Sequence, residues 1–122
     1  MTFKNTNIIY GIRNCDKTRA ALKWLDSNRI KYEFHDYKKF SLKQKKLEEW
    51  LDAIGWSQLI NKKGTTWKKL SPEEQKKIDK QKSIEPILNH LSLIKRPLLE
   101  RNENLYLGFD AKSYENILLT QR

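Results

Sequence analysis

Apolar and polar positions change period along the first part of the chain. Residues 7–10 form a short β-branched and aromatic run that Gly11 closes, which is typical of a buried strand. Apolar side chains then recur at helical spacing over residues 20–25, and Asn28 marks the end of that helix. Residues 30–37 alternate with period two, which predicts a second strand. This order predicts a βαβ unit with parallel strands.

The middle of the chain is mainly helical in pattern. Ser41 with Gln44 resembles a capping box, and the apolar residues within 47–54 then follow at helical spacing before Gly55. Residues 56–70 combine a short helical start with a Lys-Lys-Gly-Thr-Thr loop. We therefore expect a block of helices after the βαβ unit.

Further helix signals follow this block. The sequence Ser-Pro-Glu-Glu at residues 71–74 predicts a capped helix start, and Ser83 opens the next helix with Pro86 in its first turn. Residues 93–99 have the composition of a strand that Pro97 interrupts. This strand would follow the last helix of the block.

The C-terminal part predicts a hairpin and a final helix. Residues 102–104 form a turn before a strand at 105–109, and Asp110 caps a helix bearing Tyr114, Ile117 and Leu118. The predicted order is β-α-β, a helical block, then α-β-β-α. We expect one α/β domain over residues 1–122 with a helical insertion at about 40–82.

Composition excludes several kinds of site. The chain has 122 residues, one cysteine and two histidines, so it has no intrachain disulfide and too few ligands for a cysteine-based or histidine-rich metal site. We expect no metal and no bound cofactor. No segment has the ~18 apolar residues of a membrane span, and the N-terminal residues lack an export signal. One unpaired cysteine suits a reducing compartment, so we expect a cytoplasmic monomer.

The positive charge is concentrated in the middle of the chain. The net charge is +10, of which residues 38–82 contribute +7 from 13 Lys and 6 Asp or Glu. Such a segment would attract nucleic acid or acidic protein surfaces. A solvated, lysine-rich helical surface explains the same pattern more simply, and we favour it over nucleic-acid binding.

Cys15 is the main candidate for chemistry. It follows a buried strand and precedes a helix, where free N–H groups and the helix dipole favour a thiolate. Arg13, Lys17 and Arg19 add positive charge, whereas Asp16 opposes it. The alternative is an inert buried cysteine, but a polar, charged loop fits that poorly. We therefore interpret Cys15 as reactive.

The residue three positions after Cys15 is Thr18, so the chain has no C-x-x-C redox pair. Turnover then needs an external thiol, and glutathione is the natural candidate in a reducing compartment. The loop would bind the substrate or glutathione through its polar side chains and backbone amides. These residues are Arg13, Asn14, Asp16, Lys17 and Thr18.

Arg96 and Pro97 form a second feature. Proline within a strand removes a donor from the ladder, and an ordinary edge-strand proline beside an exposed arginine is the simpler interpretation. The alternative is a cis peptide bond with Arg96 directed at the cysteine loop as an anion clamp.

Five segments of the chain resemble the ArsC family, and most closely its YffB branch. They are residues 10–16, 35–37, 64–70, 95–99 and 107–109. The resemblance implies a thioredoxin-like fold with a helical insertion. It also implies a nucleophilic cysteine after the first strand, with electrons from glutathione and glutaredoxin. A related regulatory branch, Spx, binds RNA polymerase instead.

The resemblance also implies roles for individual residues. Cys15 matches the family nucleophile, Arg19 a basic position of the arsenate-reducing branch, and Arg96 the arginine before the cis-proline of the family. Two other arginines of arsenate reductases are absent, since this chain has Asn61 at one position and the 109–110 region at the other. Fewer guanidinium groups bind an oxyanion more weakly.

The sequence therefore predicts a glutathione-dependent oxidoreductase whose substrate is not arsenate. Cys15, Arg19 and Arg96 would be catalytic, and Pro97 would join the loop residues in binding. One alternative is an Spx-like module that binds RNA polymerase without catalysis. Another is an arsenate reductase proper, coupled to glutathione and glutaredoxin.

Overall fold

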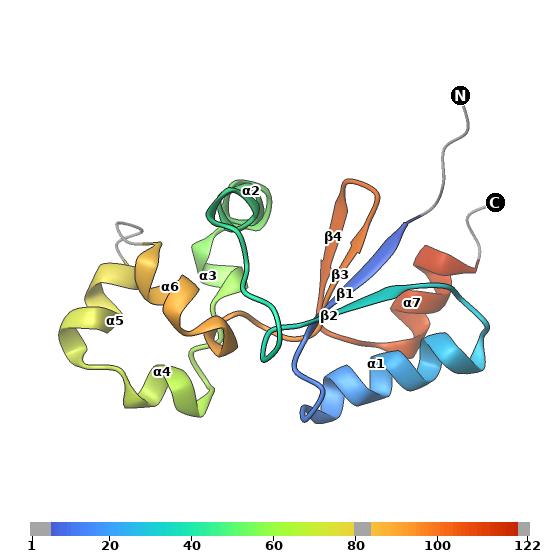
Figure 1. The fold of residues 1–122 in the computed structure, drawn as a ribbon, viewed down its shortest axis with the longest axis horizontal. Helices are drawn as coiled ribbons and strands as arrows, with labels where there is room; N and C mark the ends of the chain where they lie inside the picture. Colours follow the sequence, from blue (N-terminus) through green and yellow to red (C-terminus); the bar gives the residue numbers. More distant parts are fainter. Residues whose placement is uncertain (1–5, 80–83, 120–122) are drawn as a thin grey trace. The chain divides into compact units, whose positions relative to one another are not determined.

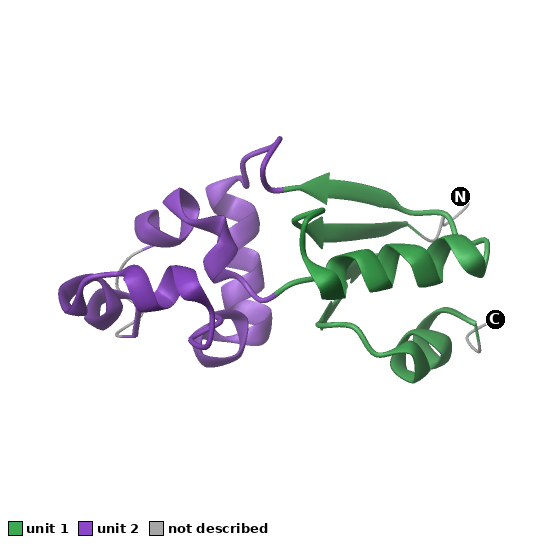
Figure 2. Cartoon of the chain, turned by 90° about the horizontal axis from the view of Figure 1, so that it is seen from below, with its two compact units in different colours: residues 1–36, 96–122 green, residues 37–95 purple. Residues whose placement is uncertain are grey.

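The computed structural model describes residues 6–79 and 84–119, which divide between two compact units (Figure 2). Unit 1 combines residues 1–36 with 96–122, and unit 2 comprises residues 37–95. The predicted insertion at about 40–82 lies within unit 2, which extends further because the helical residues after position 83 also belong to it. The expectation that residues 1–122 form one domain stays a prediction.

Unit 1 is built on a four-stranded sheet. Its strands are β1 (Asn7–Gly11), β2 (Glu33–Asp36), β3 (Leu98–Arg101) and β4 (Asn104–Leu107), in the order β2-β1-β3-β4. Strand β1 runs parallel to β2 and antiparallel to β3, so Ile9 lies opposite both Phe34 and Leu99. The predicted parallel βαβ unit and C-terminal hairpin are both confirmed.

Two helices of unit 1 pack against the same apolar cluster of the sheet: α1 (Asp16–Ser27) and α7 (Ala111–Leu118) (Figure 1). Ile9 and Leu99 supply the sheet side of this core. The helices supply its other buried members, which are Ala21, Leu22, Leu25 and Tyr114. Burying each large apolar side chain contributes about 1.5–3 kcal/mol. The core therefore fixes α1 on the sheet, with its first turn after the end of β1.

Residues near the ends of the helices and strands of unit 1 explain where these elements begin and end. Asp110 accepts hydrogen bonds from the Ser113 N–H at 3.0 Å and the Ser113 hydroxyl at 2.8 Å, so the predicted cap of α7 is confirmed. Asn28 lies at the C-cap of α1, as predicted. The hairpin turn contains Asn102 with a φ of 56°, a left-handed conformation that asparagine tolerates.

Unit 2 is helical. It contains α2 (Gln44–Ile54), α3 (Trp56–Leu59), α4 (Thr65–Lys69), α5 (Pro72–Asp79), α6 (Glu85–Asn89) and the 3₁₀ helix η1 (Leu91–Leu93). A bridge between Ile60, which follows α3, and Ile94, which follows η1, joins two distant segments of this helical series. The buried side chains include Leu47, Trp50, Leu51, Leu59, Trp67, Ile78, Ile87 and Leu93.

Of the helix ends predicted in unit 2, some are confirmed and one is wrong. The Ser71 hydroxyl accepts the Glu74 N–H at 3.1 Å and donates to the Glu74 carboxylate at 3.3 Å, so this cap is confirmed. Gly55 ends α2 with a φ of 96°. The Ser41 capping box is wrong, because α2 begins at Gln44 with Lys43 in the N-cap position.

Three element boundaries also differ from the predictions. The strand predicted at 93–99 is correct only at its C-terminal end, because residues 91–93 form η1 and β3 begins after Pro97. The second strand covers only residues 33–36 of the predicted 30–37, and the predicted 62–66 loop ends where Thr65 begins α4. The helix start predicted at Ser83 lies outside the described residues.

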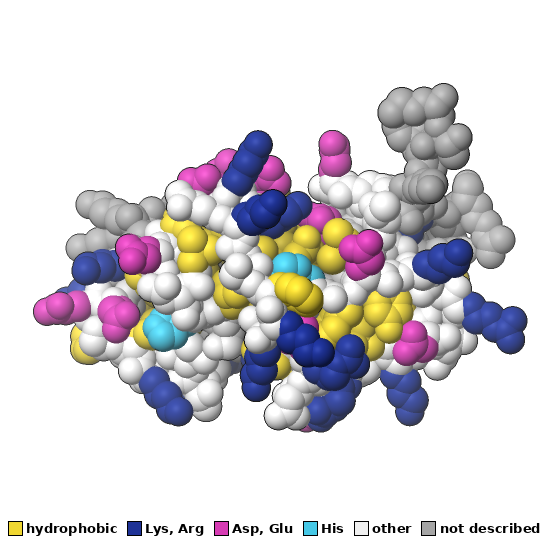
Figure 3. Space-filling view, viewed as in Figure 1, with side chains coloured by type: hydrophobic (Ala, Val, Ile, Leu, Met, Phe, Trp, Pro, Cys, Tyr) yellow, Lys and Arg dark blue, Asp and Glu magenta, His cyan; other side chains and the backbone are white. Residues whose placement is uncertain are grey.

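Basic and acidic side chains both occur on the visible surface. Figure 3 shows Lys and Arg side chains with acidic side chains among them. In unit 2, Lys62 pairs with Asp79 and lies 5.3 Å from the centre of the Trp67 ring. The expectation of a solvated, lysine-rich helical surface stays a prediction. Across residues 6–79 and 84–119, no helix has the length and apolar character needed to cross a bilayer.

The Ser71 cap gives a first prediction. Ser71→Ala removes the oxygen that accepts the Glu74 N–H, so we expect the free energy of unfolding to fall by about 1 kcal/mol. Urea denaturation measures the change. Ser57→Ala is the matched control, because Ser57 is an exposed residue within α3. Equal effects of the two substitutions would contradict a capping role for Ser71.

Candidate active site at the start of the first helix

Cys15 occupies the N-cap position of α1, directly after the loop that follows β1. Its backbone is extended, with φ −128° and ψ 127°, and its carbonyl accepts the Arg19 N–H at 2.8 Å. The side chain is half-buried. The amides of the first helical turn have no partner within the helix and leave a positive end there. The predicted place of Cys15 at a strand-to-helix turn is therefore confirmed.

The pKa of the Cys15 thiol is lower than its ordinary value. Burial raises this pKa, but the N–H and the hydroxyl of Thr18 and the guanidinium of Arg96 together lower it by more. The donors therefore act by favouring the charged form over the neutral one. At neutral pH this increases the fraction of thiolate, which is the nucleophilic form.

Thr18 is the most enclosed residue of the predicted loop. Its side chain is 0% exposed, and among the described residues its hydroxyl has no hydrogen-bond partner other than the sulfur that it faces. We predicted Thr18 as a binding residue from its place in the sequence. The structure gives it a different position, beneath the surface, where it acts on Cys15 rather than being open to a substrate.

Arg96 belongs to the second sequence segment of unit 1 and lies beside the Cys15 thiol. The Arg96–Pro97 peptide bond is cis, and Pro97 is buried just before β3. Because β3 lies between β1 and β4, the interpretation of Pro97 as an edge-strand proline is wrong. The accompanying expectation of an exposed Arg96 is also wrong, since this side chain is half-buried and lowers the Cys15 pKa.

The Arg19 guanidinium bonds to two neighbouring side chains of the loop. One guanidinium nitrogen donates to the Asn14 side chain at 3.1 Å, and another pairs with the Asp16 carboxylate. The Arg19 and Asp16 side chains are 52% and 94% exposed, so this ion pair contributes little stability. Asp16 thus offsets part of the positive charge of Arg19.

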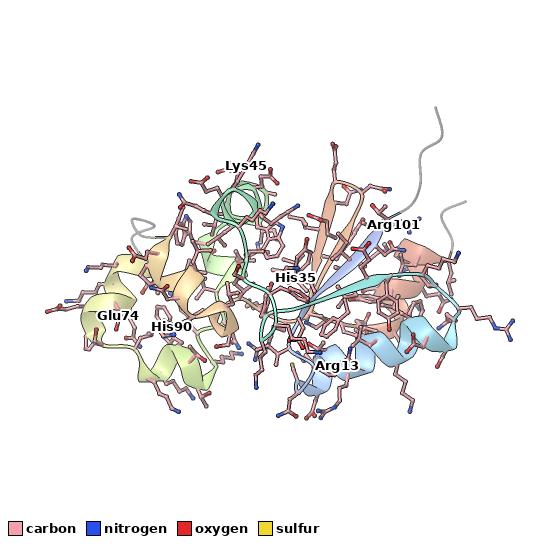
Figure 4. All side chains as sticks on the ribbon, in the orientation of Figure 1. Arg13, His35, Lys45, Glu74, His90 and Arg101 are labelled. Carbon is pink, nitrogen blue, oxygen red and sulfur yellow. The ribbon has the colours of Figure 1, made fainter. Side chains whose placement is uncertain are left out.

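Arg13 lies against Phe34 of β2. Its guanidinium carbon is 4.8 Å from the centre of the Phe34 ring, a cation–π distance. Figure 4 shows Arg13 near the start of α1, whereas Arg101 lies toward the opposite end of the strands. Phe34 was missed by the sequence reasoning, although its alternation with its neighbours in the strand placed it on one face. Lys17 is exposed in the first turn of α1.

These positions divide the predicted site into two groups. Cys15, Thr18 and Arg96 come together around the sulfur. The other loop side chains form an exposed rim, which comprises Arg13, Asn14, Asp16, Lys17 and Arg19. Among residues 6–79 and 84–119, no group of three His, Cys, Asp or Glu side chains could hold a metal ion. The arrangement supports nucleophilic attack by a thiolate.

Comparison with known proteins agrees with this chemistry. The model of the ArsC family matches residues 10–117. An uncharacterized protein of Haemophilus influenzae is 35% identical over 107 residues, which cover 88% of this chain and 94% of that protein.

Two solved structures extend the comparison. A protein named YFFB is 37% identical with a TM-score of 0.85, covering 92% of this chain and 98% of its own. An arsenate reductase (ArsC) related protein from Brucella melitensis is 38% identical with a TM-score of 0.73, covering 98% and 99%. Because the family model covers residues 10–117 and these relatives match the chain almost end to end, this protein belongs to the ArsC family, with a thioredoxin-like fold and the general chemistry of a thiol-dependent oxidoreductase.

Proposed function

We propose that this protein reduces glutathione mixed disulfides, or similar small oxidised thiols, with Cys15 as nucleophile and glutathione as electron donor. The observation that carries the proposal is the set of donors that Thr18 and Arg96 direct at the only cysteine of the chain. A single thiol cannot form an internal disulfide. The electrons that restore it must therefore come from a second molecule.

The reaction has two exchange steps. The Cys15 thiolate attacks the glutathione sulfur of a mixed disulfide, forms a Cys15–glutathione disulfide and releases the other sulfur as a thiol. A glutathione thiolate then attacks the bound glutathione sulfur, which returns Cys15 to the thiolate and releases oxidised glutathione. One substrate disulfide is reduced, and two glutathione units are joined. The lowered pKa of Cys15 serves both steps, since Cys15 is the attacking group first and the leaving group second.

The charges around the sulfur suit an anionic thiol compound. Arg13, Lys17 and Arg19 are exposed, and Arg96 lies beside the sulfur. One acidic side chain, Asp16, lies between them in the loop. Glutathione carries carboxylates. One of them would replace the Asp16 carboxylate as the partner of Arg19, or pair with Arg96. The exposed rim would therefore attract and orient glutathione at the sulfur.

The same charges are less suited to arsenate. Asn61 replaces one arginine of the arsenate reductases, and its side chain accepts the Lys63 N–H at 3.2 Å within a turn. The second missing arginine corresponds to the 109–110 region. There Phe109 packs edge-on against Tyr114 with ring centres 4.8 Å apart, and Asp110 caps α7. These positions contribute local structure and no guanidinium group, which supports a disulfide substrate over an oxyanion.

The setting of the reaction follows from the same thiol. An unpaired cysteine persists in a reducing compartment, so we place the reaction in the cytoplasm with the protein as a monomer. Glutaredoxin is a second candidate source of the thiol that releases Cys15. Neither partner needs a bound cofactor.

Mass spectrometry tests the first exchange step. After incubation with oxidised glutathione at pH 7, we expect one glutathione on the wild-type chain, because Cys15 is its only cysteine. Reduced glutathione should remove it. Cys15→Ser is the control and should remain unmodified.

An unmodified wild-type chain would contradict the proposed reaction and favour the Spx-like alternative, which needs no thiol chemistry. A parallel assay follows glutathione oxidation with glutaredoxin present. Oxidation that depends on arsenate would show an arsenate reductase instead.

The pH dependence of alkylation tests the donors. Iodoacetamide is uncharged, so its rate follows the thiolate fraction, and its midpoint should lie below the ordinary thiol pKa. Thr18→Val removes a hydroxyl that favours the thiolate, so the pKa rises and the thiolate fraction at pH 7 falls. We expect the alkylation rate at pH 7 to drop by about tenfold, the equivalent of one hydrogen bond to a charged group.

Thr65→Val is the matched control, because Thr65 is exposed in α4. Its alkylation profile should follow that of the wild type. If Thr18→Val also titrates like the wild type, its hydroxyl does not act on the sulfur.

A further inference from the structure

Gly11, the last residue of β1, lies directly against Thr18. A Cβ built on Gly11 would be 2.7 Å from Thr18 Oγ1 and 3.1 Å from Thr18 Cγ2, both shorter than ordinary contacts. The backbone of Gly11 is not in the left-handed region, so an alanine there would have an allowed conformation. Glycine is therefore needed at this position for space alone.

The backbone is fixed on both sides of the contact between Gly11 and Thr18. Gly11 pairs with Asp36 in the parallel ladder of β1 and β2, which fixes its backbone. Thr18 is fully buried in the first turn of α1, and that helix is held by Ala21, Leu22 and Leu25 in the core. A side chain at position 11 would therefore push on the Thr18 side chain itself.

We propose that Gly11 is a positioning residue of the active site, whose missing side chain leaves the space in which the Thr18 hydroxyl lies against β1 and faces Cys15. In the sequence, Gly11 marked only the end of a strand. The inference rests on the proposed function, in which the Cys15 thiolate is the reacting group.

If the Thr18 hydroxyl is displaced, an alternative rotamer offers it another hydrogen-bond acceptor. Threonine in a helix can rotate so that its hydroxyl donates to a carbonyl three or four residues earlier, which here means residue 15 or 14. In that rotamer the hydroxyl no longer donates to the sulfur. Gly11 thus favours the one rotamer that supports the thiolate.

Alkylation by iodoacetamide tests this in a double-mutant cycle with Thr18→Ala. Gly11→Ala should slow alkylation at pH 7 several-fold, and at most to the rate of Thr18→Ala. Alanine at position 18 removes both crowded atoms, and the remaining Cβ contact is an ordinary 3.5 Å. The double variant should therefore titrate like Thr18→Ala alone, because Gly11 acts only through the Thr18 hydroxyl.

Gly64→Ala is the matched control. A Cβ at Gly64 would be 2.9 Å from the Asn61 side-chain nitrogen, a comparable crowding at the end of a flexible side chain in unit 2. Its alkylation profile should match that of the wild type. This separates an effect on the thiol from the general effect of replacing a crowded glycine.

Several outcomes would overturn the inference. If the wild type has a low midpoint and Gly11→Ala keeps it, Gly11 does not position Thr18, while the proposed function stands. If the wild type titrates as an ordinary thiol, the proposed function itself fails. If Gly11→Ala does not fold, the double variant still decides, since a rate different from that of Thr18→Ala shows that Gly11 acts by another route.

Discussion

The charge state of the Cys15 sulfur depends on two opposing effects, and the packing of unit 1 sets the balance between them. Partial burial at the start of α1 disfavours a charged sulfur. The donors of Thr18 and Arg96 favour it by more. Thr18 comes from the first turn of α1, whereas Arg96 comes from the residue before Pro97 and β3. Both must be placed accurately, and the core around Ile9 and Leu99 does this by fixing α1 and β3 on one sheet.

Most elements of the fold could be predicted because their signals are local. The Ser71 and Asp110 caps, the end of α1 at Asn28 and the end of α2 at Gly55 each depend on a few adjacent residues. The Ser41 cap failed although its local pattern was as good as that of Ser71. The chain enters α2 two residues later than this pattern indicates, with Lys43 at the N-cap. A capping pattern shows where a helix can begin, and the surrounding chain decides whether it does.

The site was less predictable because its decisive contacts are distant in sequence or hidden from composition. Cys15 and Thr18 are three residues apart, and their relation follows from one helical turn. The approach of Arg96 depends on β3 lying next to β1, which residue chemistry near Pro97 does not specify. Arg19 shows the opposite case. It has the right spacing and charge, but its guanidinium is occupied by Asn14 and Asp16.

The Thr18 hydroxyl is hard to explain by stability. A buried hydroxyl without an acceptor destabilises a fold by about 1–3 kcal/mol, and valine has nearly the same shape. Tyr114 also has a buried hydroxyl, yet its ring fills the core against Trp24 and Phe109, so packing accounts for that residue. Packing gives no such reason for an oxygen at position 18. The Cys15 sulfur does, because a hydroxyl that donates to this sulfur favours its thiolate form.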